Sequence, residues 1–128
     1  MKRKLAGFLC VMVCSLFVGC GGGGAGGNSP GGVVKTYMKA VIEGDTKKAL
    51  TCIDPAKRQQ AGQLLEMATA IASGFAQVEG GLDSVTILSE DVQGDRAQVG
   101  YQTKTKKGVE RRDSLRTEKI NGTWYVAP

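Results

Sequence analysis

Residues 97–105 read AQVGYQTKT and contain the clearest structural signal in the chain. Every second position is small, apolar or β-branched, and these positions are Ala97, Val99, Tyr101, Thr103 and Thr105. Polar residues or glycine stand between them. A period of two residues is typical of a β-strand with one buried and one wet face. Gly94-Asp95 before the stretch and Lys107-Gly108 after it are turn signals. The stretch therefore predicts an inner strand with a tight turn at each end.

The neighbouring segments predict three more strands. Residues 85–92 form the first, residues 109–120 form a long polar strand, and residues 123–126 form the last. Asn121-Gly122 between the last two is the preferred sequence of a two-residue hairpin turn. Four strands joined in order by tight turns predict an antiparallel meander.

The first half of the chain has helical periodicity instead. A first helix begins at Val33 and ends near Gly44, and Asp45 caps a second short helix. Asp54-Pro55 has the N-cap and first-turn proline of a third and longer helix. We expect its apolar stripe to be buried; the stripe consists of Ala61, Leu64, Leu65, Ala68, Ile71, Ala72 and Phe75. Three N-terminal helices packed on a four-stranded antiparallel sheet give an α+β fold.

Residues 1–19 have the pattern of a signal peptide, with Lys2-Arg3-Lys4 followed by 14 uncharged residues. That run is shorter than the about 20 residues that span a bilayer as a helix. It ends at Gly19-Cys20, which resembles the lipobox of bacterial lipoproteins, where cleavage makes an acylated cysteine the mature N-terminus. Phe17 departs from the leucine usual in that motif. The resemblance implies lipidation of Cys20, and an ordinary secretory signal is the alternative.

Lipidation would hold the protein in the bacterial cell envelope, on a membrane outside the cytoplasm. We expect the outer membrane where the cell has two, because Gly21 replaces the aspartate that retains some lipoproteins at the inner membrane. Residues 20–32 then form a lipidated cysteine and a glycine-rich tether, and residues 33–128 form the domain. A phosphate-binding loop is disfavoured because the tether lacks the Gly-Lys-Ser/Thr ending.

The composition excludes several classes of function. The chain has no histidine, which removes Ser-His and Cys-His nucleophile pairs and every histidine metal site. After removal of residues 1–19, 14 Lys and Arg face 12 Asp and Glu, a net charge of +2 that gives no reason to expect nucleic acid. Cys52 is then the one cysteine not assigned to the leader or the lipid, so we expect a buried thiol, no metal and no cofactor.

Three segments carry a resemblance to the nuclear transport factor 2-like, or cystatin-like, α+β fold. They are VVKTYM (residues 33–38), EGDTKKAL (43–50) and INGTWYV (120–126). Within that group the chain resembles small bacterial lipoproteins whose domain has no assigned function. The resemblance implies a curved sheet that can enclose a cavity. Enzymes of the group use an Asp or His base with a Tyr or Asp partner in that cavity, and no such pair stands out in this sequence.

Two sets of residues are candidates for a functional site. The first could line an apolar cavity, although core packing also explains it: Tyr37, Phe75, Tyr101 and Trp124. The second is a basic cluster around one hairpin: Lys104, Lys106, Lys107, Arg111, Arg112 and Arg116. The cluster either keeps a long strand soluble and unpaired or contacts anionic headgroups or an acidic partner.

We therefore expect a membrane-anchored, non-enzymatic domain that binds a small apolar ligand or another envelope protein. The alternative is an isomerase-like or dehydratase-like enzyme acting in the cavity of the sheet. An inhibitor or immunity-type partner is a third class, and a homodimer formed through the sheet is a further expectation. The missing histidine and the missing acid/base pair favour the binding domain.

Overall fold

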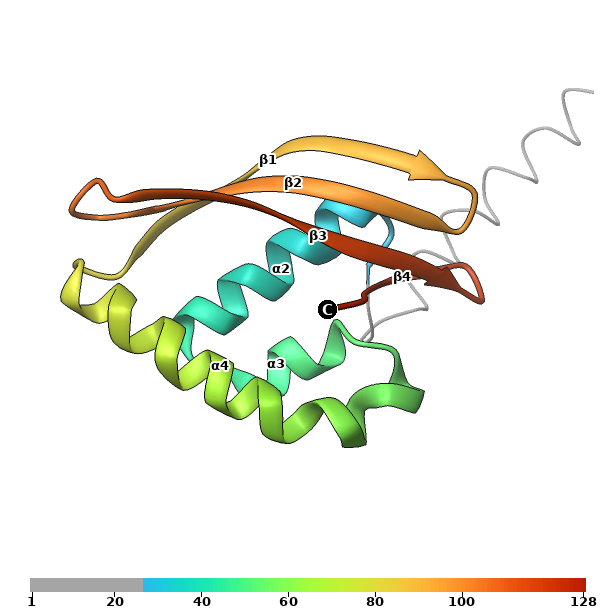
Figure 1. Ribbon diagram of the computed structural model, residues 1–128, viewed down its shortest axis with the longest axis horizontal. Helices are drawn as coiled ribbons and strands as arrows, with labels where there is room; N and C mark the ends of the chain where they lie inside the picture. Colours follow the sequence, from blue (N-terminus) through green and yellow to red (C-terminus); the bar gives the residue numbers. More distant parts are fainter. Residues whose placement is uncertain (1–26) are drawn as a thin grey trace, which may run out of the picture.

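The computed structural model describes residues 27–128, in which helices precede strands along the chain (Figure 1). The helical elements are α2 (Pro30–Glu43), α3 (Thr46–Thr51), the 3₁₀ turn η1 (Pro55–Lys57) and α4 (Arg58–Val78). The strands are β1 (Leu82–Gln93), β2 (Arg96–Thr105), β3 (Glu110–Ile120) and β4 (Thr123–Val126). The predicted signal peptide, Gly19 and Cys20 lie outside the described residues.

The four strands form one antiparallel sheet in the order β1-β2-β3-β4, which confirms the predicted meander. Its last turn is Asn121-Gly122, with φ of 52° and 83°, as a hairpin turn matched to strand twist requires. All five alternating residues of β2 are buried on one face. The sheet curves over the helices, so this inner face forms one wall of the core (Figure 1). The α+β class and the curved sheet are confirmed.

The helices form two layers beneath the sheet. Helix α2 packs against all four strands and supplies much of the core, including the fully buried Val33 and Val34. Helices α3 and α4 pack mainly on α2 and on each other (Figure 1). The expectation that three helices pack on the sheet is therefore correct for α2 and too broad for the other two.

Helix α2 begins at Pro30, three residues earlier than the sequence pattern predicts. The Ser29 side chain caps it by accepting a hydrogen bond from the Gly32 backbone N–H at 3.0 Å. A Cβ at Gly31 would lie 2.6 Å from Glu90 Oε2 and 3.2 Å from Ile87 Cγ2. Gly31, interpreted from sequence as part of a tether, thus permits close contact between the first turn of α2 and β1.

Helix α4 contradicts the predicted burial of most of its apolar stripe, in which Leu65 is buried, Ala61 and Ala72 are half-buried and the other residues are exposed. Leu65, Thr69 and Ala76 are its buried residues. The Thr69 hydroxyl lies 2.9 Å from the Thr46 hydroxyl of α3, which satisfies both polar groups. Leu64 and Ile71 are 72% and 58% exposed. The helix therefore packs through Leu65 and smaller residues, and it turns its other large apolar residues outward.

Ile53 marks the point where the helical layer joins the sheet, through a parallel bridge to Val126. Its side chain is 1% exposed. We expect Ile53→Val to lower the free energy of unfolding by about 1 kcal/mol, because one buried methylene and its contacts are lost. Fluorescence of the buried Trp124 during urea unfolding measures this loss. Ile71→Val makes the same chemical change at an exposed site, and an equal effect there would contradict the assigned core.

Candidate functional site

A cavity of about 680 Å³ lies between the helices and the inner face of the sheet. Helices α2 and α4 and the start of β1 contribute its apolar surface: Met38, Ile42, Ala72, Phe75, Ala76 and Leu82. Strands β2 and β3 contribute a polar wall and rim: Tyr101, Thr103, Thr105, Arg111, Arg112 and Asp113. Its size and its apolar lining with a few polar groups are typical of small-molecule sites.

Two hydroxyl groups of β2 face this cavity. No hydrogen bond among residues 27–128 uses the hydroxyl of Tyr101 or of Thr103, and neither oxygen is sealed from solvent. Burial raises the pKa of Tyr101, and the charges of Asp113 and Tyr37 raise it further. The Tyr101 hydroxyl therefore stays protonated at neutral pH and can donate a hydrogen bond to a bound molecule.

Residues of β3 complete the site through the register of the sheet. Asp113 lies opposite Tyr101, and Arg111 lies opposite Thr103. Directly opposed residues of antiparallel strands share a face, so these two charged groups border the cavity. Arg111 donates to both carboxylate oxygens of Glu79 at 2.8 and 2.7 Å, which links β3 to the end of α4.

Tyr101 and Asp113 lie opposite each other on neighbouring strands, as an acid/base pair could, but Asp113 is not shielded from solvent. Asp113 is exposed, and its carboxylate accepts a hydrogen bond from the Ser114 backbone N–H at 2.8 Å. A general base of this kind works best in a shielded site that tunes its proton affinity. The Tyr101 hydroxyl is therefore suited to holding a polar group of a ligand, and Asp113 is poorly placed to move its protons.

The Glu79–Arg111 pair makes stability depend on pH. Hydrogen bonding to Arg111 lowers the pKa of Glu79 below its ordinary value of 4.5. A carboxyl group whose pKa is lower in the folded state than in the unfolded state stabilises the fold at pH values above its unfolded-state pKa. This stabilisation is lost as the pH falls through the folded-state pKa of the group. We therefore expect Glu79→Gln to lower the urea midpoint at pH 7 and to lower it less at pH 3.

Glu66→Gln is the matched control for this prediction, because Glu66 is an exposed glutamate of α4, the helix that Glu79 follows directly. Equal pH profiles for the two variants would contradict a stabilising role of the pair.

The predicted aromatic set divides between the cavity and the core. Phe75 and Tyr101 line the cavity. Tyr37 and Trp124 are buried in the core and are not among the lining residues. Trp124 exchanges backbone hydrogen bonds with Gly27, and the Lys119 ammonium lies 5.8 Å from the centroid of its ring. Sequence analysis did not assign Thr103, Thr105 or Met38 to the site, although the alternation of β2 places both threonines on the face of Tyr101.

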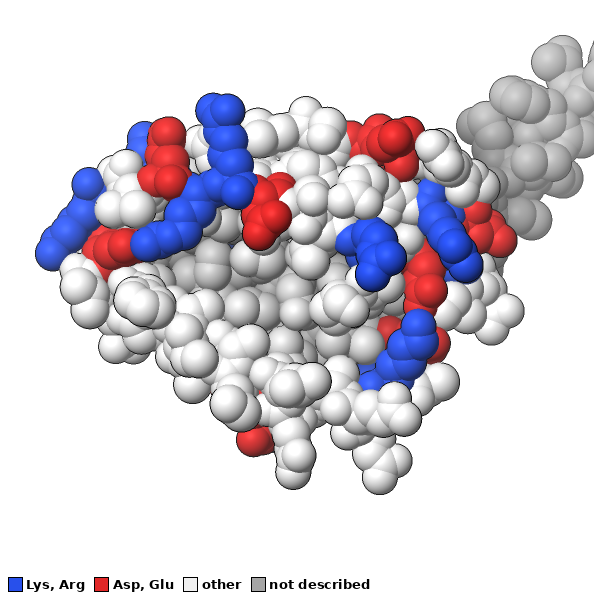
Figure 2. Space-filling model, viewed as in Figure 1, with Lys and Arg blue, Asp and Glu red and all other residues white. Residues whose placement is uncertain are grey.

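The basic cluster is also divided. Arg111 and Arg112 are among the residues that line the cavity. The Arg112 Nε donates to Gln102 at 2.8 Å, on the face of the sheet opposite Tyr101 and Thr103. Lys107 donates to the Val78 carbonyl at 3.0 Å. Figure 2 shows acidic groups between the basic ones at this end of the molecule. Lys104 and Lys106 are exposed near the turn between β2 and β3, whereas Arg116 lies farther along β3. The cluster is therefore partly neutralised.

The turn between β2 and β3 (residues 106–109), called the basic turn below, lies far from Gly27, the first described residue. Gly27 pairs with Trp124, and Trp124 lies opposite Lys119 near the end of β3. Lys119 lies eight residue steps along β3 from Arg111, a distance of about 27 Å at ~3.4 Å per residue. The turn between β2 and β3 therefore lies at the opposite end of the sheet from the turn between β3 and β4 (Figure 1), beside which Gly27 pairs with Trp124. The cavity residues Thr105 and Arg111 lie next to the turn between β2 and β3, so the cavity is also far from Gly27.

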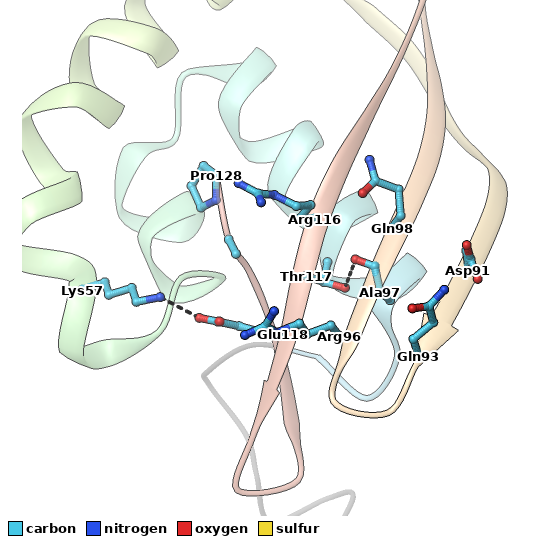
Figure 3. A pocket seen from close by; sticks show the side chains of 11 residues that line it. Lys57, Asp91, Gln93, Arg96, Ala97, Gln98, Arg116, Thr117, Glu118 and Pro128 are labelled. Atoms are coloured by element: carbon cyan, nitrogen blue, oxygen red, sulfur yellow. Dashed lines mark hydrogen bonds and ion pairs between the residues drawn. The ribbon is translucent and has the colours of Figure 1, made fainter.

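A second hollow of about 610 Å³ has a different chemistry. Figure 3 shows that the side chains lining this hollow come from η1, from β1, β2 and β3, and from the C-terminus. Lys57 pairs with Glu118 at 2.9 Å, and the exposed side chains of Arg96, Arg116 and Asp91 also line the hollow. Mixed exposed charges that pair with one another are typical of a solvated surface. We therefore base the candidate site on the first cavity.

Cys52 does not belong to either hollow. Its side chain is 1% exposed, and burial raises the pKa of its thiol. Residues 27–128 contain no group of three or more Cys, Asp or Glu side chains arranged to hold a metal ion. Within the same residues no helix is long and apolar enough to cross a membrane.

Comparison with solved structures gives the fold. A candidate nuclear transport factor 2-like transpeptidase from Campylobacter jejuni matches with a TM-score of 0.71 at 18% identity, covering 77% of this chain and 96% of that one. A SEC-C motif containing protein from Rhodopseudomonas palustris matches with a TM-score of 0.51 at 18% identity, covering 79% and 77%. None of the curated proteins compared with the chain matches it. At this identity the matches show a nuclear transport factor 2-like fold.

The family comparison extends over both the helices and the sheet. One family model matches residues 23–127, which include every described element and the full lining of the cavity. The chain belongs to the family described as Domain of unknown function (DUF4878).

Proposed function

We propose that this protein is a lipid-anchored envelope protein whose domain binds a small, mainly apolar molecule in the cavity between α4 and the sheet. The observation that carries this proposal is an apolar surface beside the hydroxyls of Tyr101 and Thr103, which make no hydrogen bond within residues 27–128. A molecule with an apolar body and one polar group satisfies both, because burying a hydroxyl without a partner is costly.

The predicted anchor sets where this cavity would face. Seven Cα–Cα steps separate Cys20 from Gly27, so the fold would begin within about 25 Å of the lipid. The cavity lies far from Gly27, which favours a mouth directed away from the membrane. In this arrangement the ligand reaches the protein from the aqueous side, and the basic turn is better placed for an acidic solute or partner than for headgroups.

An enzyme remains the second candidate, and the opposition of Tyr101 and Asp113 is the observation that favours it. The exposure of Asp113 favours binding instead. The two candidates differ in what Asp113→Asn does. A binding domain keeps its affinity in this variant, whereas an enzyme that uses Asp113 as a base loses turnover.

The test is a titration of the polypeptide of residues 21–128 with an apolar fluorescent probe that carries one carbonyl group. We expect Tyr101→Phe to weaken binding about fivefold, because one hydrogen bond is lost. Tyr125→Phe is the matched control, since Tyr125 is equally buried and does not line the cavity. Equal affinities for wild type and Tyr101→Phe would contradict the assigned role of the hydroxyl.

A further inference from the structure

Helix α4 carries an apolar stripe on the side turned away from the other helices, and Phe75, at one edge of this stripe, also lines the cavity. Five large residues are more than half exposed: Leu64 (72%), Met67 (64%), Ile71 (58%), Phe75 (62%) and Val78 (71%). Spacings of three and four residues place them on one side of an α-helix. Together they expose on the order of 600 Å², the upper end of what single-chain proteins leave uncovered. Something is therefore expected to cover this face.

The stripe has a symmetry of its own. Ile71 is its centre, Met67 and Phe75 lie four residues to either side, and Leu64 and Val78 lie seven residues to either side. If two such helices lie antiparallel about a two-fold axis at Ile71, each residue meets an apolar partner. Leu64 then faces Val78 of the partner subunit, and Ile71 faces Ile71 of the partner subunit. A self-complementary surface is what a two-fold interface requires.

We propose that two copies of this chain pair through α4, antiparallel, with Ile71 at the two-fold axis. The area is sufficient, because two stripes would bury roughly 1,200 Å², the lower limit for specific stable interfaces. The stripe extends about 21 Å along the helix, long enough for three turns to interdigitate. Small residues flank it, and a Cβ at Gly74 would meet no atom within 4 Å, so a second helix can approach closely.

The charges of α4 favour a second copy over a lipid surface. Arg58 and Glu66 are its only charged residues, and Arg58 donates to the carbonyls of Ile53 and Thr51. Helices that lie in a membrane interface usually carry Lys and Arg along their polar face, and α4 carries glutamine and small residues there. The mixed composition of the stripe and its symmetry are better suited to a matching protein surface.

Cysteine cross-linking of the full chain in isolated membranes tests this proposal. We expect oxidised Ile71→Cys to form at least tenfold more disulfide-linked dimer than the wild type, because the two thiols meet at the axis. Gln77→Cys is the matched control, since it is exposed on the same helix outside the stripe. The buried Cys52 is expected to contribute little background. Equal cross-linking of Ile71→Cys and Gln77→Cys would overturn the proposal.

Two differently tagged chains test the direction of pairing. Leu64→Cys in one chain and Val78→Cys in the other are expected to cross-link, whereas two copies of Leu64→Cys are not. Preferential Leu64→Cys self-linkage would show parallel helices and contradict the two-fold arrangement. Cross-linking through Val92→Cys of β1 but not through Ile71→Cys would assign the dimer to the sheet. Labelling of Ile71→Cys by a lipid-borne thiol reagent, without dimers, would assign the stripe to the membrane.

Discussion

Cys20→Ala is expected to abolish acylation of the protein completely. In cells fed an alkyne analogue of palmitate, the wild type should carry the label and partition into the detergent phase, and the variant should carry none. The reason is that Gly19-Cys20 ends an uncharged apolar run in the pattern of a lipobox. Two or three acyl chains hold a protein on a membrane stably, whereas one chain binds marginally.

Cys14→Ala is the control for this experiment. Val13 precedes Cys14, and a bulky residue does not fit the small-residue position before the cleavage site. The control should be labelled like the wild type, and the mature N-terminus should be a modified Cys20 by mass spectrometry. Label retained in Cys20→Ala, or an unmodified mature N-terminus, would refute the lipid anchor and leave an ordinary secretory signal.

Filling the cavity is expected to reduce ligand affinity more than tenfold. Ala72 is half-buried and lines the cavity, so the ring in Ala72→Phe would occupy space that the ligand needs. Ala70→Phe adds the same ring to the same helix at an exposed position that does not line the cavity. Titration with the apolar probe should therefore separate the two variants, with Ala70→Phe close to wild type.

This comparison also tests the location of the site. Equal affinities of both variants and the wild type would place the ligand elsewhere. Equal losses in both would indicate damage to α4 rather than a filled cavity, and the urea midpoint of each variant distinguishes that case.

The sheet could be predicted from the sequence because its signals are local. The alternation of residues 97–105 gives the buried face of β2, and Asn121-Gly122 gives the last hairpin. The length of the loop between β2 and β3 is harder to predict from the sequence. A two-residue turn at Lys107-Gly108 would pair Tyr101 with Ser114, whereas the observed register pairs it with Asp113. A change of one residue in loop length moves a different side chain to the cavity.

The role of α4 could not be predicted from its periodicity. An apolar stripe indicates that one side of a helix is suited to burial, but it does not show whether this chain or another molecule covers that side. Here Thr69 contacts Thr46 of α3 and Ala76 is buried, whereas Leu64 and Ile71 remain exposed. The cavity depends on the same arrangement, because Ala72 and Phe75 reach it from α4 only when the helix is turned in this way.

Extraction and mass spectrometry of the small molecule that co-purifies with residues 21–128 test the proposed function directly. The wild type should carry close to one equivalent of an apolar molecule, which Ala72→Phe lacks and Ala70→Phe retains. The molecule should keep its mass after prolonged incubation with the protein. Equal amounts in all three proteins, or conversion to a new product that Asp113→Asn prevents, would contradict a domain that binds without catalysis.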